Sequence, residues 1–354
     1  MAETILEPDL PIVDPHHHLW DRRSHATPPS PSGAPPPHPF ITAIADAQRY
    51  LLDELLTDTG SGHNVRATVF VECGAMYRAD GPVEMRPVGE TEFVNGVAAM
   101  SASGSYGQTR ACAGIVGKAD LLLGDAVKPV LEAHVLAGGG GRAGGGRFRG
   151  IRNSASFEAD KEVLGPLNRV EQGLYLDATF REGFKHLAPM GLSFDAWLLE
   201  PQLPDVIDLA RAFPDTTIIL DHVGTPLGRG SFAGRLNERF PIWRDNIHEL
   251  ARSPNVVVKL GGLAMAFCNF PSFLAEPRAS SEQLAREWAP YIEACIAAFG
   301  PERCMFESNF PVDMGSCTYA TLWNAFKRIA AGYSADEKTA LFSGTATKVY
   351  RLAH

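Results

Sequence analysis

Short apolar runs alternate with longer amphipathic stretches along almost the whole chain of 354 residues. Apolar runs that are each followed by a helix-like stretch indicate parallel strands covered by helices. We predict eight strands, over 11–14, 66–72, 111–116, 149–152, 192–197, 217–220, 256–260 and 304–307. Eight such units favour a closed α/β barrel, the (β/α)8 or TIM barrel, as a single domain over residues 1–354.

Apolar residues at helical spacing predict the intervening helices. We expect helices over 43–56, 92–101, 121–136, 203–213, 242–251, 282–299 and 319–331, and a last helix over 344–352. The early strands are not followed by a G-x-G-x-x-G sequence. This weakens the alternative of an open dinucleotide-binding sheet.

Two segments interrupt this alternation. Residues 24–39 are rich in proline and extend the loop after the first strand, on the face where barrels keep their sites. Residues 138–146 are rich in glycine and precede the fourth strand. We expect this second insertion on the opposite face, where it is structurally neutral.

Composition restricts the classes of partner. The net charge is −9 and lysine and arginine form no dense stripe, which argues against nucleic acid and against an anionic membrane. None of the six cysteines forms a C-x2-C pair, and no run of about 18 apolar residues or signal peptide is found. We expect a cytoplasmic protein acting on a small molecule, with a homodimer as one option for its assembly.

The strongest chemical signal is a histidine cluster directly after the first strand, in the sequence Asp-Pro-His-His-His-Leu-Trp-Asp over 14–21. Residues i and i+2 of an extended segment point the same way, so His16 and His18 face one side and His17 the other. Two such imidazoles can clamp a divalent metal or hydrogen-bond a substrate carbonyl or carboxylate. The simpler alternative is a chance histidine cluster.

Two more polar segments follow later strands. His222 comes after the run 217–220, and Glu307, Asn309 and Asp313 follow the last strand. Catalytic groups of barrels sit at the carboxyl ends of strands, so His222 matches the His16–His18 pair in position. The segment 306–313 could equally be a polar turn in which Asp313 caps a helix.

Candidate substrate contacts are less specific. Arg152 and Lys259 lie at or near strand ends and could bind a carboxylate, although structural salt bridges explain both equally well. Tyr77 and Trp197 could wall an apolar pocket, together with Trp20 and Met265, but ordinary packing is the simpler explanation for each.

Together these motifs resemble the amidohydrolase superfamily. The motifs are HxH at 16–18, DHVG at 221–224 and ESNFP at 307–311, supported by VE at 71–72, GIVG at 114–117, RGIR at 149–152, VKLGG at 258–262 and LFSGTA at 341–346. The nearest branch is the amidohydrolase-2 type, which contains 2-pyrone-4,6-dicarboxylate lactonase-like and sugar-lactonase-like barrels. The resemblance covers nearly the whole chain and is specific for fold and superfamily, but not for substrate.

The resemblance implies that the strand-one histidines, the strand-six histidine and a strand-eight aspartate converge. In metal-using members such residues bind Zn²⁺ or a similar ion, which for this chain would involve His16, His18 and His222. The metal lowers the pKa of water and polarises the carbonyl. In the pyrone-lactonase branch the reaction is metal-free, the histidines polarise the carbonyl and the aspartate is the base. The cofactor is therefore expected to be one divalent metal or none.

The chain departs from this pattern in two places. Asn309 stands where the family has its strand-eight aspartate, and an amide cannot take up a proton at neutral pH. The segment 192–197 lacks the histidine that decarboxylase-like relatives have there. Four residues remain as candidate bases: His222 and Asp313, which we rank slightly above Glu307, and Glu72. Asn309 could orient the water or the carbonyl.

We expect a hydrolase that opens a lactone or related cyclic ester of a small carboxylated or aromatic-derived molecule. Water would attack a carbonyl polarised by His16 and His18, with or without a metal. A metal-dependent decarboxylase of the same superfamily is one alternative, and amide hydrolysis is a weaker one. A catalytically silent ligand-binding barrel is a further alternative, for which Asn309 is the main support.

Overall fold

The computed structural model describes residues 3–23, 37–141 and 146–352. Its centre is a barrel of eight strands in sequential order, and each hydrogen-bonded pair is parallel. The strands are β1 (Pro11–His17), β4 (Asn64–Val71), β5 (Arg110–Gly117), β6 (Phe148–Arg152), β7 (Ser193–Ala196), β8 (Ile218–Leu220), β9 (Val256–Leu260) and β10 (Cys304–Phe306). Beyond β10, the backbone N–H of His18 donates to the Phe310 carbonyl over 2.8 Å, which closes the barrel. The (β/α)8 fold and its eight predicted strands are confirmed.

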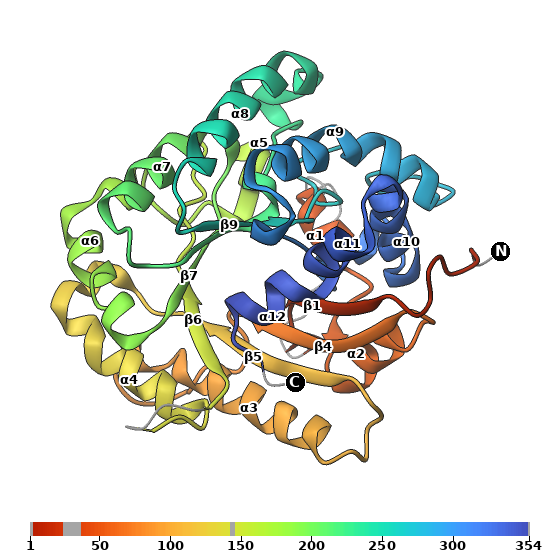
Figure 1. The fold of residues 1–354 in the computed structure, drawn as a ribbon. Helices are drawn as coiled ribbons and strands as arrows, with labels where there is room; N and C mark the ends of the chain where they lie inside the picture. Colours follow the sequence, from red (N-terminus) through yellow and green to blue (C-terminus); the bar gives the residue numbers. More distant parts are fainter. Residues whose placement is uncertain (1–2, 24–36, 142–145, 353–354) are drawn as a thin grey trace, which may run out of the picture.

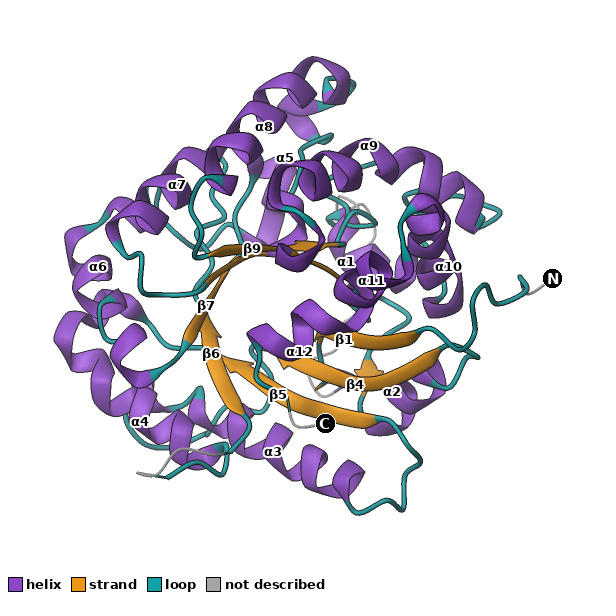
Figure 2. Cartoon of the chain, viewed as in Figure 1, coloured by secondary structure: helices purple, strands orange, loops and turns teal. Residues whose placement is uncertain are grey.

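Helices form a ring outside the strands (Figure 2). They are α1 (Pro39–Ala43), α2 (Leu52–Thr59), α3 (Val88–Ala102), α4 (Lys128–Ala137), α5 (Lys161–Leu164), α6 (Ala178–Phe184), α7 (Leu203–Ala212), α8 (Leu236–Ala251), α9 (Ser281–Phe299), α10 (Tyr319–Ile329), α11 (Ala335–Thr339) and α12 (Thr345–Val349). The described segments contain no helix long and apolar enough to cross a membrane.

The prediction of one helix over 43–56 is wrong. Residues 44–51 instead contain the short strand β3 (Arg49–Tyr50), which pairs antiparallel with β2 (Trp20–Asp21). The indole N–H of Trp20 also donates to the carbonyl of Ala47 over 2.6 Å. These contacts with the segment after the histidine cluster override the helical periodicity, because they hold the backbone in an extended conformation.

The predicted helix over 121–136 is divided in two. A 3-10 helix over Leu121–Val127 precedes α4, and Gly124 within it has a φ of 56°. A residue in this left-handed conformation cannot continue a right-handed helix, and glycine adopts it without steric cost. Helix α6 has no counterpart among the predicted helices.

The interior of the barrel has an apolar lower layer. Alternate strand residues face inward and form one buried cluster, which includes Val13, Val69, Val116, Ile219, Val257 and Met305. Helix α12 lies at this end of the barrel (Figure 1), and Tyr350 and Leu352 after it pack into the same cluster. The chain end therefore covers the bottom of the barrel, and the carboxyl ends of the strands form the other face.

The two insertions lie largely outside the described residues. Of the proline-rich segment, 24–36 is not described, and His38 begins α1 by accepting a hydrogen bond from the Phe40 N–H. Of the glycine-rich segment, 142–145 is not described, and Gly138 ends α4. The expectations about these loops therefore stay predictions.

Candidate active site

A layer of charged side chains lies directly above the apolar layer. Because side chains of a strand alternate, the residue two positions after an inward apolar residue also points inward. Glu307 follows Met305 in this way, Asp221 follows Ile219, and Lys259 follows Val257. All three charged side chains are fully buried. The same alternation that builds the core thus delivers ionisable groups to the barrel mouth.

Glu307 connects two histidines that are far apart in sequence. Its Oε1 lies 2.7 Å from Nδ1 of His222, and its Oε2 lies 2.7 Å from Nδ1 of His16. The backbone N–H of His222 also donates to Oε1 over 3.2 Å. A carboxylate accepts and cannot donate, so the His222 ring carries its proton on Nδ1 when Glu307 is ionised. In the neutral His222 ring, Nε2 is then free of a proton.

His18 faces the same side as His16, as its spacing predicts. The ring centroids of the two histidines are 5.0 Å apart, and those of His16 and His222 are 4.7 Å apart. Nδ1 of His18 lies 2.8 Å from the Val71 carbonyl, which only accepts, so Nε2 is the unprotonated nitrogen of the neutral ring. His17 points the other way, with Nε2 2.8 Å from the Thr68 hydroxyl.

Lys259 is held among carboxylates inside the barrel. Its Nζ lies 2.6 Å from Asp195, 3.0 Å from Asp221 and 3.2 Å from Nδ1 of His16. Tyr350, from the chain end, donates its hydroxyl proton to the same oxygen of Asp195 over 2.8 Å. Burial disfavours the charged amine, but Asp195 and Asp221 outweigh this and raise the pKa of Lys259. Lys259 therefore stays charged inside the barrel.

Arg152 is held in a similar way on the other side of His16. Its Nε donates to Glu72 over 2.9 Å, and Nη1 lies 3.4 Å from Asp221 and 3.3 Å from Nε2 of His16. The ring of Trp197 lies 5.6 Å from the guanidinium carbon. Arg152 and Lys259 are thus both engaged in buried ion pairs, which was one of their two expected roles.

Burial and these cations keep His16 and His18 neutral. Burial is the largest cause that lowers the pKa of His16 far below its usual value, and Lys259 adds to it. Burial, with Arg152, likewise lowers the pKa of His18. Neutral imidazoles can accept a proton or bind a metal, whereas imidazolium cannot.

The segment after β10 docks onto the end of β1. The N–H of Asn309 donates to the His16 carbonyl over 2.9 Å, and the N–H of Ser308 donates to Asp14 over 3.0 Å. The side-chain amide of Asn309 donates to Asp313 over 2.9 Å. Asp313 does fold back, but its contact is Asn309, and burial raises its pKa well above the usual value. Glu307, ranked below Asp313 from sequence, is the residue that reaches the histidines.

The backbone around His222 is unusual and crowded. His222 and Val223 have φ values of 55° and 48°, a left-handed conformation that is costly for a β-branched residue. Such strain persists only where surrounding structure enforces it, and it gathers at functional sites. Gly261 and Gly262 after β9 make room here, because a Cβ at either would collide with Glu307 or His222.

Three of these groups have the chemistry of a metal site. His16, His222 and Glu307 each offer a ligand atom within 4.8 Å of the others, and His18 is outside this group. Two imidazoles and one carboxylate are a donor set of catalytic zinc sites. The surrounding layer has four carboxylates and two cations, which leaves two negative charges. The carboxylates are Glu72, Asp195, Asp221 and Glu307, and the cations are Arg152 and Lys259. The donor set and the net charge both fit a divalent cation.

Comparison with known proteins agrees with these features. The amidohydrolase family model matches residues 13–352. The chain belongs to the amidohydrolase family. As a member, it is a hydrolase. The uncharacterized protein y4mH of Sinorhizobium fredii is 36% identical over 345 residues, which are 97% of this chain and 99% of that protein.

Two relatives carry functional information. An L-fucono-1,5-lactonase of Burkholderia multivorans is 32% identical over 209 residues, which are 59% of this amidohydrolase and 64% of that protein. A crystal structure of an amidohydrolase from Burkholderia multivorans with bound zinc superposes with a TM-score of 0.70. The two sequences are 26% identical, and the match covers 97% of this chain and 99% of that one.

Sequence reasoning missed several members of the site of this amidohydrolase. Asp195, Asp221 and Tyr350 belong to its buried network but received no role from sequence. The period-two alternation within strands could have found the two aspartates. Tyr350 carries no such signal, since it reaches the barrel only through the packing of the chain end.

Proposed function

We propose that this amidohydrolase opens a lactone or related cyclic ester by addition of water. The observation that carries the proposal is the hydrogen bond between Glu307 and His222 at the barrel mouth. A carboxylate that holds Nδ1–H of an imidazole orients the ring and stabilises the imidazolium that forms when Nε2 takes up a proton. The lactonase among its relatives supports a cyclic ester as the substrate class.

In the proposed reaction, Nε2 of His222 accepts a proton from water as the oxygen attacks the carbonyl carbon. Arg152, fixed by Glu72 and Asp221, supplies positive charge for the oxyanion of the tetrahedral intermediate. The ring C–O bond then breaks, and the leaving alkoxide receives the proton from His222. The product is the open hydroxy acid, so one water is consumed per lactone.

A divalent ion at this site would be held by His16, His222 and Glu307. When bound, it supplies a Lewis acid for the carbonyl oxygen and lowers the pKa of water. Glu307 and His222 would then serve as ligands, whereas without an ion they form the hydrogen-bonded pair described above. Activity measured with chelator and with added zinc distinguishes these two forms.

The test is turnover of a panel of sugar lactones, aromatic lactones and carboxylated lactones by the purified enzyme. We expect hydrolysis by the native enzyme and loss of it in His222→Ala. His17→Gln is the matched control, because His17 belongs to the same cluster but points toward Thr68. Absence of turnover on every lactone, together with release of CO2 from an aromatic carboxylate, would favour the decarboxylase and contradict the proposal.

A further inference from the structure

We propose that Arg22 forms a subsite for a carboxylate group of the substrate, at the edge of the barrel mouth. The inference rests on the proposed function in one respect, namely that the substrate enters through this mouth. It concerns the part of the substrate that does not react. Neither the family pattern nor the histidine motif points to Arg22.

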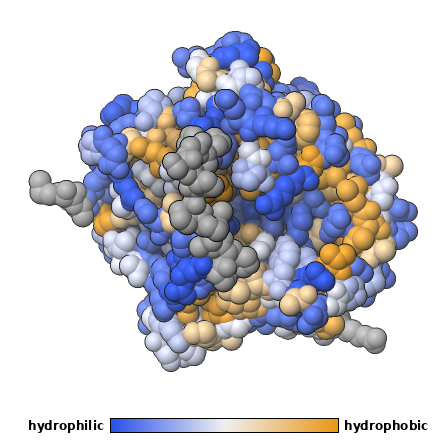
Figure 3. Space-filling model, turned by 180° about the vertical axis from the view of Figure 1, so that it is seen from behind, coloured by the Kyte–Doolittle hydropathy of each residue, from blue (hydrophilic) through white to orange (hydrophobic). Residues whose placement is uncertain are grey.

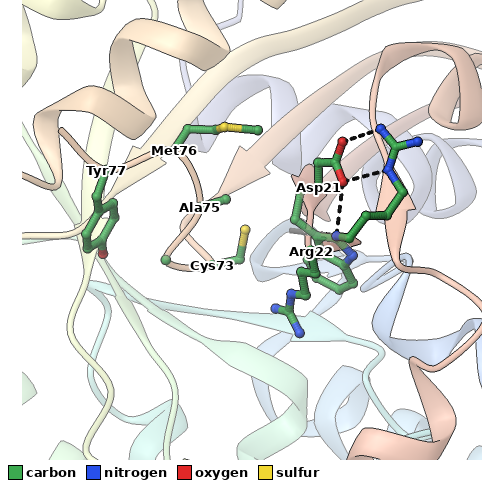
Figure 4. Close-up of a pocket in the computed structure, with 9 residues that line it drawn as sticks. Asp21, Arg22, Cys73, Ala75, Met76 and Tyr77 are labelled. Carbon is green, nitrogen blue, oxygen red and sulfur yellow. Dashed lines mark hydrogen bonds and ion pairs between the residues drawn. The ribbon is translucent and has the colours of Figure 1, made fainter. Parts of the chain in front are cut away.

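Arg22 lines a cavity of about 780 Å³. The loops that follow β1 and β4 form its walls, so it opens on the face of the barrel that holds the strand ends. Figure 4 shows Arg22 on one side of this cavity and Tyr77 on the other, with Cys73 between them. The volume lies in the range of small-molecule sites. Seen from this face, hydrophilic residues surround a hollow near the centre of the molecule (Figure 3).

The charge of Arg22 is not balanced by a neighbouring acid. Its neighbour Asp21 points away and binds Arg23 through both carboxylate oxygens, at 2.9 and 2.6 Å (Figure 4). Within residues 3–23, 37–141 and 146–352, no carboxylate pairs with Arg22. Arg152 and Lys259, by contrast, are each held by two carboxylates. Arg22 is therefore a cation of the mouth that can still receive an anion.

Other charged groups nearby do not neutralise the positive charge of Arg22. Glu72 already accepts a hydrogen bond from Arg152. Burial and the proximity of Glu72 raise the pKa of Glu90 to about 8, so that Glu90 is mostly uncharged at neutral pH. Arg169 is close enough to act on Arg22 and, like burial, lowers its pKa. A carboxylate beside Arg22 would counteract both effects, because it stabilises the charged guanidinium.

The way Arg22 is held leaves its donors available. Its guanidinium carbon lies 4.0 Å from the centre of the Trp20 ring. Stacking on an aromatic face uses the plane of the guanidinium, whereas the N–H groups point outward along its edge. That edge matches the two oxygens of a carboxylate. Trp20 is itself fixed by its hydrogen bond to Ala47, so the donor group is positioned in advance.

A row of rings connects this subsite with the reacting centre. His16 and His18 have centroids 5.0 Å apart, and the rings of His18 and Trp20 are stacked with centroids 6.0 Å apart. Trp20, at the end of this row, lines the cavity that holds Arg22, whereas His16 and His18 are buried and do not line it. The subsite therefore selects molecules whose carboxylate is remote from the reacting ester.

The test uses equilibrium binding, which needs no turnover. The probes are 3-phenylpropanoate and 3-phenylpropanamide, which share shape but differ in charge, measured by titration calorimetry. We expect native enzyme to bind the carboxylate more tightly, and Arg22→Gln to weaken that binding roughly tenfold to a hundredfold while leaving the amide unchanged. Arg22→Lys, which keeps the charge but loses the fork, should fall between the two.

Arg23→Gln is the matched control. It removes the same charge from the next residue along the chain, whose side chain is already paired with Asp21. It should leave both affinities within about twofold of native. The proposal is overturned if native enzyme does not prefer the carboxylate, or if the two glutamine variants behave alike. If the preference depends on Arg22 but lactones are not hydrolysed, the subsite stands and the proposed reaction fails.

Discussion

Oε1 of Glu307 lies 2.7 Å from Nδ1 of His222, which joins the ends of the last and the sixth strands of the barrel. The two residues are 85 positions apart in sequence, and both are buried. Their hydrogen bond orients the imidazole as a base, and four predictions concern this centre and its surroundings.

Replacing Glu307 by glutamine should reduce kcat by about a hundred- to ten-thousand-fold, because an amide cannot stabilise the imidazolium of His222. The comparison is Asp313→Asn, which should keep most activity. Burial already favours the neutral form of Asp313, and its contact is the Asn309 amide. Steady-state kinetics of both variants provide the measurement. Equal losses would mean that Asp313 acts in the reaction.

Lys259→Met should destabilise the protein by about 3–5 kcal/mol, since it leaves Asp195 and Asp221 buried without their shared cation. Denaturant unfolding measures the change. Adding Asp195→Asn to this variant should restore part of the lost stability, because it removes one of the two unpaired charges. A double variant that is less stable than the single one would refute this account.

Glu90 should make the protein less stable as the pH rises. Burial raises its pKa in the folded state to about 8, whereas an unfolded chain releases this proton near the ordinary value of 4.5. Between these values the folded state binds more protons than the unfolded state, so the free energy of unfolding falls as pH rises. Well above pH 8, the stabilising contribution of the Glu90 proton is lost completely.

Glu90→Gln should remove this dependence. The amide oxygen can still accept the N–H of Ala75, which now donates to Glu90 over 2.7 Å. Melting temperatures of native enzyme and variant between pH 5 and 9 test the prediction. The melting temperature of the variant should rise relative to that of the native enzyme toward pH 9. A difference in melting temperature that stays constant with pH would contradict the prediction.

Zinc should raise the melting temperature of the native enzyme, because an ion that binds only the folded state stabilises it. His16→Asn should diminish this shift, since it removes one of three ligands. His186→Asn is the control, because His186 lies at the surface beside Asp125. Elemental analysis should then find about one zinc per chain in the native enzyme and in His186→Asn, and less in His16→Asn. Equal shifts in both variants would place the ion elsewhere.

The sequence by itself determined the barrel and the place of its site. Eight apolar runs followed by amphipathic stretches allow few other folds, and the alternation of side chains along a strand orients His16 and His18 in one direction. The positions of His222 and Glu307 at strand ends follow from the same pattern. These features are local, so they can be seen without knowledge of which strands are neighbours.

The tertiary structure decided which of the candidate groups meet. The sequence after the last strand does not distinguish the roles of Glu307, Asn309 and Asp313. In the structure, this segment docks onto the end of β1, which turns Asn309 toward Asp313 and leaves Glu307 between the histidines. Tyr350 reaches Asp195 only because the chain end covers the bottom of the barrel. Arg22 becomes an anion site only because Trp20 holds it and no described acid opposes it. Charge balance and hydrogen-bond partners depend on distances between residues remote in sequence, and packing alone sets those distances.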